Sequence, residues 1–97
     1  MHAAAVRVEL RIRGPQSLKE KRHIVKSVTA QLDERFAVSV AEVDDQDKWQ
    51  KTTLGIAVVA PQASRLTEIL HRIERYLGSR DDIEVLRVST SHLERPE

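Results

Sequence analysis

The order in which two hydrophobic periods follow one another constrains the fold of this chain most strongly. Residues 6–12 alternate aliphatic and charged side chains, which is the period of a strand with one buried face. A Gly-Pro pair ends this strand, and Ser17 with Glu20 forms a capping box that starts a helix. Apolar residues spaced by threes and fours continue the helix to the neighbourhood of Arg35. The first third of the chain is therefore predicted to be a strand followed by a helix.

The rest of the chain uses the same two periods in a different order. Its predicted elements are a strand at 36–43, a loop at 44–51, a strand at 52–60, a helix that begins between 62 and 64 with Gly78 as its C-terminal cap, and a strand at 83–90. The order β-α-β-β-α-β is that of the ferredoxin-like fold, an α+β fold in which two helices pack on one face of a four-stranded antiparallel sheet. We expect a single domain over 1–97, with an ordered core at 6–90 and a short frayed tail.

The composition excludes several kinds of chemistry. The chain has no cysteine, so disulfides, zinc-thiolate sites and thiol catalysis are excluded. Sixteen basic and fifteen acidic residues leave a formal charge of +1, which gives no strong long-range attraction to nucleic acid or to a membrane surface, so any binding of a polyanion must come from local clustering. We expect neither DNA nor a membrane as a partner. No catalytic triad, metal-ligand set or phosphate-binding loop is complete, so we expect no catalytic residue, no metal and no cofactor. The N-terminus lacks the apolar core of a signal peptide, which favours a cytoplasmic protein.

A basic stretch opens the first predicted helix, and it consists of Lys19, Lys21, Arg22 and Lys26. At helical spacing such side chains can follow a phosphate backbone. Basic residues in a first turn also oppose the helix dipole, at roughly 0.3 to 1 kcal/mol per charge, which favours a role other than stability. The alternative, and the commoner outcome for a run of charges, is a solvated helix face partly neutralised by the aspartates of the loop at 44–51.

The acidic loop lies at the same end of the predicted sheet as this basic stretch, because the first two strands of the fold are parallel. It carries Asp44, Asp45 and Asp47, and Glu42 precedes them. These carboxylates can bind Mg²⁺ directly or through water. The spacing lacks the glycine and the distal glutamate of a calcium loop, however, and lysines flank it closely. A network of salt bridges to the first helix, or capping of loop amides, is therefore favoured over a metal site.

Trp49 is the only tryptophan and follows the acidic loop directly. It can stack on a nucleobase, or it can pack over the end of the core or in a subunit contact, and packing or an interface is favoured. The sheet face opposite the helices is predicted to carry charged, small and aliphatic residues of the first and third strands. Those strands carry no aromatic residue, which argues against the usual RNA-recognition mode of this fold and favours a homo-oligomer, a dimer formed through the sheet face or through an edge strand.

Two charged motifs resemble a known bacterial family. The sequences SLKEKRHIVKS at 17–27 and AEVDDQDKWQ at 41–50, together with the LGIAVV that begins at Leu54, are similar to those of the YlxP-like proteins, a family of unknown function. The resemblance implies a ferredoxin-like fold and no known enzymatic activity. The genes of this family commonly lie beside those of translation and ribosome-maturation factors. The resemblance therefore implies a connection to the ribosome or to RNA.

The sequence as a whole favours a non-enzymatic accessory protein that acts in translation or small ribosomal subunit maturation through contact with RNA or a ribosomal protein. The residues expected to bind RNA or a partner are Lys19, Lys21, Arg22, Lys26, Asp44, Asp45, Asp47 and Trp49. The alternative is a homo-oligomeric protein-interaction or small-ligand-sensing module that makes no contact with RNA. A metal-dependent enzyme that uses the aspartates is the third hypothesis.

Overall fold

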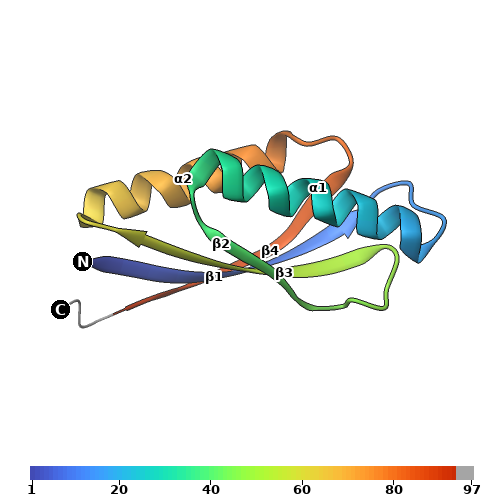
Figure 1. Cartoon of the computed structure of the whole chain (residues 1–97), viewed down its shortest axis with the longest axis horizontal. Helices are drawn as coiled ribbons and strands as arrows, with labels where there is room; N and C mark the ends of the chain where they lie inside the picture. Colours follow the sequence, from blue (N-terminus) through green and yellow to red (C-terminus); the bar gives the residue numbers. More distant parts are fainter. Residues whose placement is uncertain (94–97) are drawn as a thin grey trace.

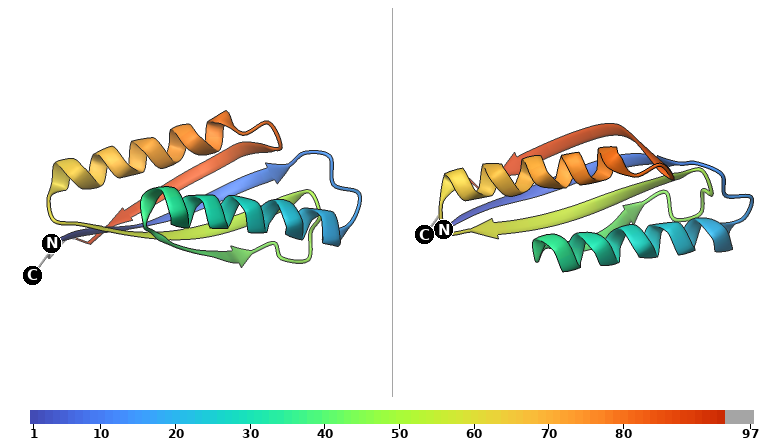
Figure 2. Two further views of the ribbon diagram at one scale, coloured as in Figure 1. Left: turned by 45° about the horizontal axis from the view of Figure 1, so that its top comes forward. Right: turned by 90° about the horizontal axis from the view of Figure 1, so that it is seen from above.

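The structure, a computed structural model, describes residues 1–93 and has the element order expected from the sequence (Figure 1). Its elements are β1 (His2–Ile12), α1 (Leu18–Phe36), β2 (Ser39–Asp44), β3 (Lys51–Ala60), α2 (Ala63–Ser79) and β4 (Ile83–His92). The four strands form one antiparallel sheet in the order β2-β3-β1-β4. Both helices cover the same face of this sheet, as the three views agree (Figures 1 and 2). The predicted ferredoxin-like fold is confirmed.

The core lies between the helices and one face of the sheet and is aliphatic. Alternate residues of the two central strands face the helices and are fully buried, because successive side chains of a strand point to opposite faces. The buried strand residues of this core are Ala4, Val6, Val8, Leu10, Ile12, Leu54, Ile56, Val58, Ala60 and Ile83, and the helices contribute Val25, Val28, Leu32, Leu66, Ile73 and Leu77. Within residues 1–93 no element covers the opposite face of the sheet, and we call it the open face.

The first helix is longer, and the second strand shorter, than the sequence indicated. The prediction placed Phe36 in the second strand, but Phe36 ends α1 and packs edge-to-face on Tyr76, with ring centroids 6.1 Å apart. Ala37 then takes the left-handed conformation at φ 52°, and its amide donates to the carbonyl of Asp33. This αL cap turns the chain, so β2 begins only at Ser39.

The first and the last strand of the chain extend further than expected. β1 begins at His2, whose register partner is Ala60 of β3. β4 continues to His92, and the amide of Leu93 donates to the carbonyl of Ala3. Pairing with the long third strand therefore orders the alanine-rich start of the chain, which lacks the period of a strand. The rest of the predicted frayed tail, 94–97, lies outside the described residues.

The prediction that Gly78 caps α2 was wrong. Gly78 lies inside the helix, which runs from Ala63 to Ser79, and the C-terminal cap is Arg80 with an extended backbone. The Arg80 side chain fixes this turn: it pairs with Asp82 at 2.6 Å and donates to the hydroxyl of Tyr76 at 3.0 Å. These two bonds of the Arg80 side chain, which we call the Arg80 clamp, end the helix in place of the left-handed glycine that ends many other helices.

Both edge strands contain a register shift near the same end of the sheet. β2 shifts against β3 between Glu42 and Asp44, and the pairing of β1 with β4 shifts between Glu9 and Leu10, where Leu86 is the extra residue of β4. A β-bulge of this kind turns two successive side chains toward one side of the sheet.

Candidate nucleic-acid interface

The start of α1 and the β2–β3 loop lie at the same end of the sheet, as the topology predicts (Figure 2). Ser17 caps the helix: its hydroxyl accepts from the amide of Glu20 at 3.2 Å. The carboxylate of Glu20 in turn accepts from the amide of Gln16 at 2.5 Å, one residue before the position of a standard capping box. These bonds satisfy amides at the helix N-terminus and set the direction in which α1 leaves the loop.

Lys21 joins the helix to the acidic loop. Its ammonium lies 2.7 Å from Glu42 Oε2, 2.8 Å from the carbonyl oxygen of Asp45 and 3.3 Å from that of Gln46. An ammonium has three donors, so all of them are used. Glu42 also accepts from the hydroxyl of Thr52 at 2.5 Å. The predicted salt bridge between the acidic segment and the first helix is present, and Lys21 makes it.

The sequence placed Lys21 on the exposed side of the helix with the other basic residues, and this placement was wrong. The side chain has 0% exposed surface and cannot touch RNA or a partner from this position. Its spacing carried the signal, because Lys21, Val25, Val28 and Leu32 recur at four, three and four residues on the buried stripe of α1. Lys21 is a positioning residue for the loop, and the exposed basic surface lacks it.

Asp45 organises the loop from within. It takes a left-handed backbone at φ 63°, and its carboxylate accepts from the hydroxyl of Thr53 at 2.7 Å and pairs with Lys48 at 3.1 Å. The Thr53 hydrogen bond, followed by the bond and charge of Lys48, holds the pKa of Asp45 below its ordinary value. Asp45 in turn raises the pKa of Lys48. This aspartate is buried and already bonded, so it acts in loop structure rather than in direct contact with a ligand.

The other two aspartates occupy different environments. Asp44 accepts from the amide of Asp45 at 2.8 Å, the capping of a loop amide that was expected, and it lies 3.4 Å from Arg7. Asp47 is exposed and lies near Trp49. Within residues 1–93, no three His, Cys, Asp or Glu side chains gather in a group that could hold a metal ion.

The remaining predicted basic residues do share one exposed surface. Lys19, Arg22 and Lys26 line a hollow of about 950 Å³ beside the first two turns of α1, and Arg13 and His23 complete its basic lining. Within the described chain, Lys19, Arg22 and Lys26 form no ion pair. Two of the loop aspartates expected to neutralise them have other partners: Asp44 pairs with Arg7, and Asp45 pairs with Lys48 and Lys51. We call Arg13, Lys19, Arg22, His23 and Lys26 the basic surface.

Trp49 does not cover the core. Its side chain is 48% exposed, and it lines a second hollow, of about 700 Å³, with Arg11 and Leu86. Leu86 is itself 42% exposed. The prediction that Trp49 packs over the end of the core is therefore wrong. Stacking of Trp49 on a nucleobase and its burial in a subunit contact both remain predictions.

Two features of this end of the molecule escaped sequence reasoning. Thr52 and Thr53 are buried hydroxyls that bond to Glu42 and Asp45, respectively. Two adjacent threonines at the start of an aliphatic strand were the available signal. Arg80 donates to the hydroxyl of Ser27 in α1 at 3.3 Å, and its hydrogen bond to Asp82 holds the pKa of that carboxyl below its ordinary value.

This geometry defines a class of protein: a ferredoxin-like α+β domain with a basic surface at the start of its first helix. The sequence matches the model of a family described as "Protein of unknown function (DUF503)" over residues 3–90, and the chain belongs to this family. It is 37% identical over 68 residues to the uncharacterized protein YlxP of Bacillus subtilis (strain 168), a match that spans 70% of this chain and 74% of that protein. The resemblance to YlxP-like proteins is confirmed.

Solved structures with similar folds have unrelated sequences. The protein YJCS from structural genomics is 11% identical, with a TM-score of 0.53, over 95% of this chain and 99% of that one. A de novo designed protein with ferredoxin fold is 17% identical, with a TM-score of 0.45, over 100% of this chain and 88% of the design. At such low identity the likeness to YJCS concerns the fold alone. Neither helix of the described chain has the length and apolar character needed to span a membrane.

Proposed function

We propose that this chain is a cytoplasmic, non-enzymatic accessory protein that binds RNA phosphates through the basic surface at the start of α1. The RNA we propose is that of the small ribosomal subunit, during translation or subunit maturation. One observation carries the proposal: Lys19, Arg22 and Lys26 line one hollow and form no ion pair within residues 1–93. Unpaired cations that gather in this way supply the sequence-independent part of RNA binding.

The way the acidic groups are used supports this assignment. The prediction allowed the loop aspartates to neutralise the helix, but Asp44 pairs with Arg7, and Asp45 pairs with Lys48. Glu42 pairs with Lys21 inside the structure. Glu42, Asp44 and Asp45 are therefore used within the loop and its neighbours, and among the described residues Glu20 is the one acidic residue in the lining of the basic hollow, against three lysines and arginines of α1.

The spacing of the basic side chains also suits a polyanion. Lys19, Arg22 and Lys26 follow one another at three and four residues, so they lie on one side of the helix. They span about 10 Å along the axis at about 1.5 Å per residue, which is the rise of about three nucleotides in a stacked strand.

The test is co-sedimentation of the full chain with small ribosomal subunits at two salt concentrations. We expect binding that weakens with salt and that the double variant Lys19→Glu, Arg22→Glu loses. The matched control is Arg65→Glu, Arg75→Glu, which makes the same change in charge on α2. Circular dichroism verifies that both variants fold. Wild-type protein that stays at the top of the gradient in both salts, or a double variant that binds as well as wild type, would overturn the proposal.

The second candidate is a protein-interaction or small-ligand module without RNA contact, and the exposure of Trp49 beside Leu86 favours it. Large apolar side chains half exposed in one hollow are typical of anchors for a partner. In this case binding to the partner would depend on Trp49 and only weakly on salt. Trp49→Ala and the Lys19, Arg22 double variant, measured side by side, separate the two candidates.

A further inference from the structure

The exposed large apolar side chains are distributed unevenly over the molecule. Within residues 1–93 they belong to strands, to strand ends or to the β2–β3 loop, and none lies on α1 or α2; they are Met1, Val43, Trp49, Val59, Leu86 and Leu93. The outer surface of the helices therefore has the character of an ordinary solvated face. The open face of the sheet is different, because exposed apolar side chains are concentrated on it and around it. Exposed apolar side chains that gather in this way mark an interaction surface.

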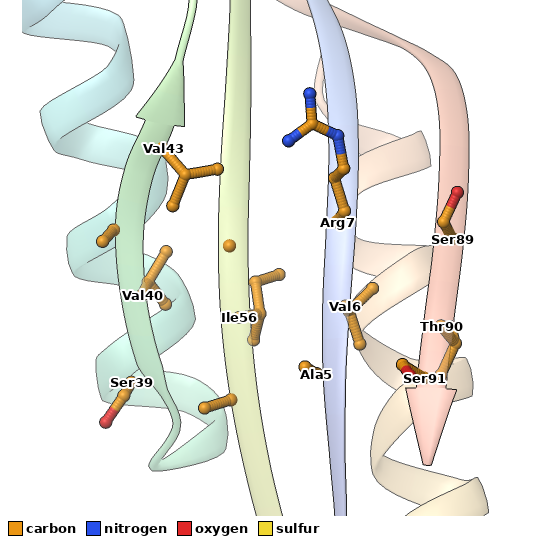
Figure 3. A pocket seen from close by; sticks show the side chains of 13 residues that line it. Ala5, Val6, Arg7, Ser39, Val40, Val43, Ile56, Ser89, Thr90 and Ser91 are labelled. Atoms are coloured by element: carbon orange, nitrogen blue, oxygen red, sulfur yellow. The ribbon is translucent and has the colours of Figure 1, made fainter.

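The middle of the open face is low and apolar (Figure 3). It forms a hollow of about 580 Å³ whose lining includes Ala5, Ala41, Gly55 and Ala57. Val43 leans from β2 across this hollow, so that one of its methyl groups stands 2.9 Å from the place where a Cβ on Gly55 would lie. Small side chains in the centre with larger ones at the margins allow another flat sheet to approach closely.

The two β-bulges make the opposite margins of this face complementary to each other. On β2 the bulge turns the apolar Val43 and the acidic Asp44 to the open face, where Asp44 meets Arg7. On β4 the corresponding bulge exposes the apolar Leu86 and the basic Arg87. Each edge strand thus presents one apolar group next to one charge, and the two charges have opposite signs.

The register places these two charges at the same height along the sheet. Asp44 is the partner of Thr53, Thr53 is the partner of Glu9, and Glu9 is the partner of Arg87. Arg87 forms no ion pair within the described chain, whereas Glu9 is already paired with Lys51 at 3.2 Å. The open face therefore lacks, within one copy, an anion for Arg87.

A two-fold axis parallel to the strands brings Arg87 the carboxylate of Asp44 from the other copy, whose only ion pair within the described chain is the exposed 3.4 Å contact with Arg7. When one sheet is turned over onto the other about this axis, the order β2-β3-β1-β4 reverses, so β2 of one copy faces β4 of its partner at the same height. Asp44 then faces Arg87 of the other copy, and Val43 faces Leu86, twice by symmetry. Packed sheets are rotated by about 30°, an offset that the long arginine side chain can span.

We propose that the open face binds a second copy of this chain, through the β2 bulge of each copy on the β4 bulge of the other. This inference is independent of the RNA proposal and leaves the basic surface on the outside of the dimer. Four strands at about 4.8 Å spacing and about ten residues at about 3.3 Å give a footprint of roughly 600 Å² per copy. Two copies reach on the order of 1,200 Å², the lower limit of a specific interface.

The test is the molar mass of the full chain in solution by sedimentation equilibrium, over a range of concentrations. We expect a mass twice the 11.1 kDa of one chain. Arg87→Asp and Leu86→Asp each place an acid opposite the partner's β2 bulge, and we expect each to raise the dissociation constant at least about tenfold. The double variant Asp44→Arg, Arg87→Asp restores the opposite charges across the axis and is expected to regain the dimer.

The control is Arg75→Asp, the same substitution on the exposed surface of α2, which is expected to leave the dimer unchanged. Circular dichroism and unfolding midpoints establish that each variant is folded. The inference is overturned by a wild-type chain that stays monomeric at every concentration. It is equally overturned if Leu86→Asp and Arg87→Asp remain as dimeric as wild type, or if exchanging the two charges gives no recovery.

Discussion

The ammonium of Lys21 lies 2.7 Å from the carboxylate of Glu42, and the lysine side chain has no exposed surface while that of the glutamate is 19% exposed. This asymmetry decides how the pair contributes to the fold. Both partners hold α1 to β2 and to the loop that follows, but only the lysine depends entirely on its partner for compensation of its charge.

Removing Glu42 is expected to cost more stability than removing Lys21. Glu42→Ala leaves a fully buried ammonium without its anion, and the loss of a partner of this kind costs about 3–5 kcal/mol. Lys21→Met removes the donor to the carbonyls of Asp45 and Gln46, but it leaves a carboxylate that water can reach and that keeps Thr52 as a donor, at about 1–3 kcal/mol. Urea unfolding measures the free energy of unfolding of both variants, provided that the dependence of this free energy on urea concentration has the same slope as in the wild type. Equal costs for the two variants would contradict the burial asymmetry.

Stability is expected to fall in acid partly through Asp45. The pKa of Asp45 is lower in the folded chain than its ordinary value of 3.8, so the folded state binds fewer protons than the unfolded state. The stability from this group is complete above the ordinary pKa and is lost as the pH falls through the lower folded pKa. Asp45→Asn should flatten the acid side of the curve of unfolding free energy against pH. Asp47→Asn serves as the exposed control, and an unchanged acid limb for Asp45→Asn would refute the assignment.

Gly78→Ala is expected to stabilise the protein, by about 0.5–1 kcal/mol. Gly78 lies within α2, its φ is not positive, and a Cβ there would meet no atom within 4 Å. Gly14→Ala is the contrasting variant, because Gly14 has φ of 89° and an alanine there is strained by about 1–2 kcal/mol. Thermal or urea unfolding separates the two. If Gly78→Ala destabilised the protein instead, the result would support the original prediction that Gly78 is the C-terminal cap of α2.

The basic surface is expected to set the salt dependence of RNA binding. Each phosphate that a side chain neutralises adds roughly 0.7–0.9 to the slope of log affinity against log salt concentration. Lys19→Gln with Arg22→Gln should therefore reduce this slope by about 1.4–1.8. The measurement is a titration of ribosomal RNA fragments at several salt concentrations, with Arg65→Gln, in the first turn of α2, as the control. A slope that does not change places the phosphate contacts elsewhere.

Local pattern accounts for most of the elements and for part of the candidate site. The alternation over 6–12 and the stripe through Val25, Val28 and Leu32 identified the strand, the helix and the buried face of each, except that Lys21 also belongs to the buried face of the helix. The end of α1 was misplaced because Phe36 has strand propensity, and its contact with Tyr76 outweighs that preference. The cap of α2 was misassigned because a glycine near a helix end usually marks the cap, whereas here the Arg80 clamp forms it.

The sequence by itself determined the order of the elements, the ferredoxin-like fold, the family and the end of the sheet where the charged segments meet. Those properties follow from periodicity and connectivity, which are local or topological. Only the tertiary structure decided that Lys21 and Asp45 are interior groups while Lys19, Arg22 and Lys26 remain free, and that two bulges turn opposite charges onto one sheet face. The reason is physical, because burial and strand register depend on which atoms of distant segments come into contact. The sequence does not indicate whether water or a carboxylate surrounds the charge of a long side chain in the folded protein.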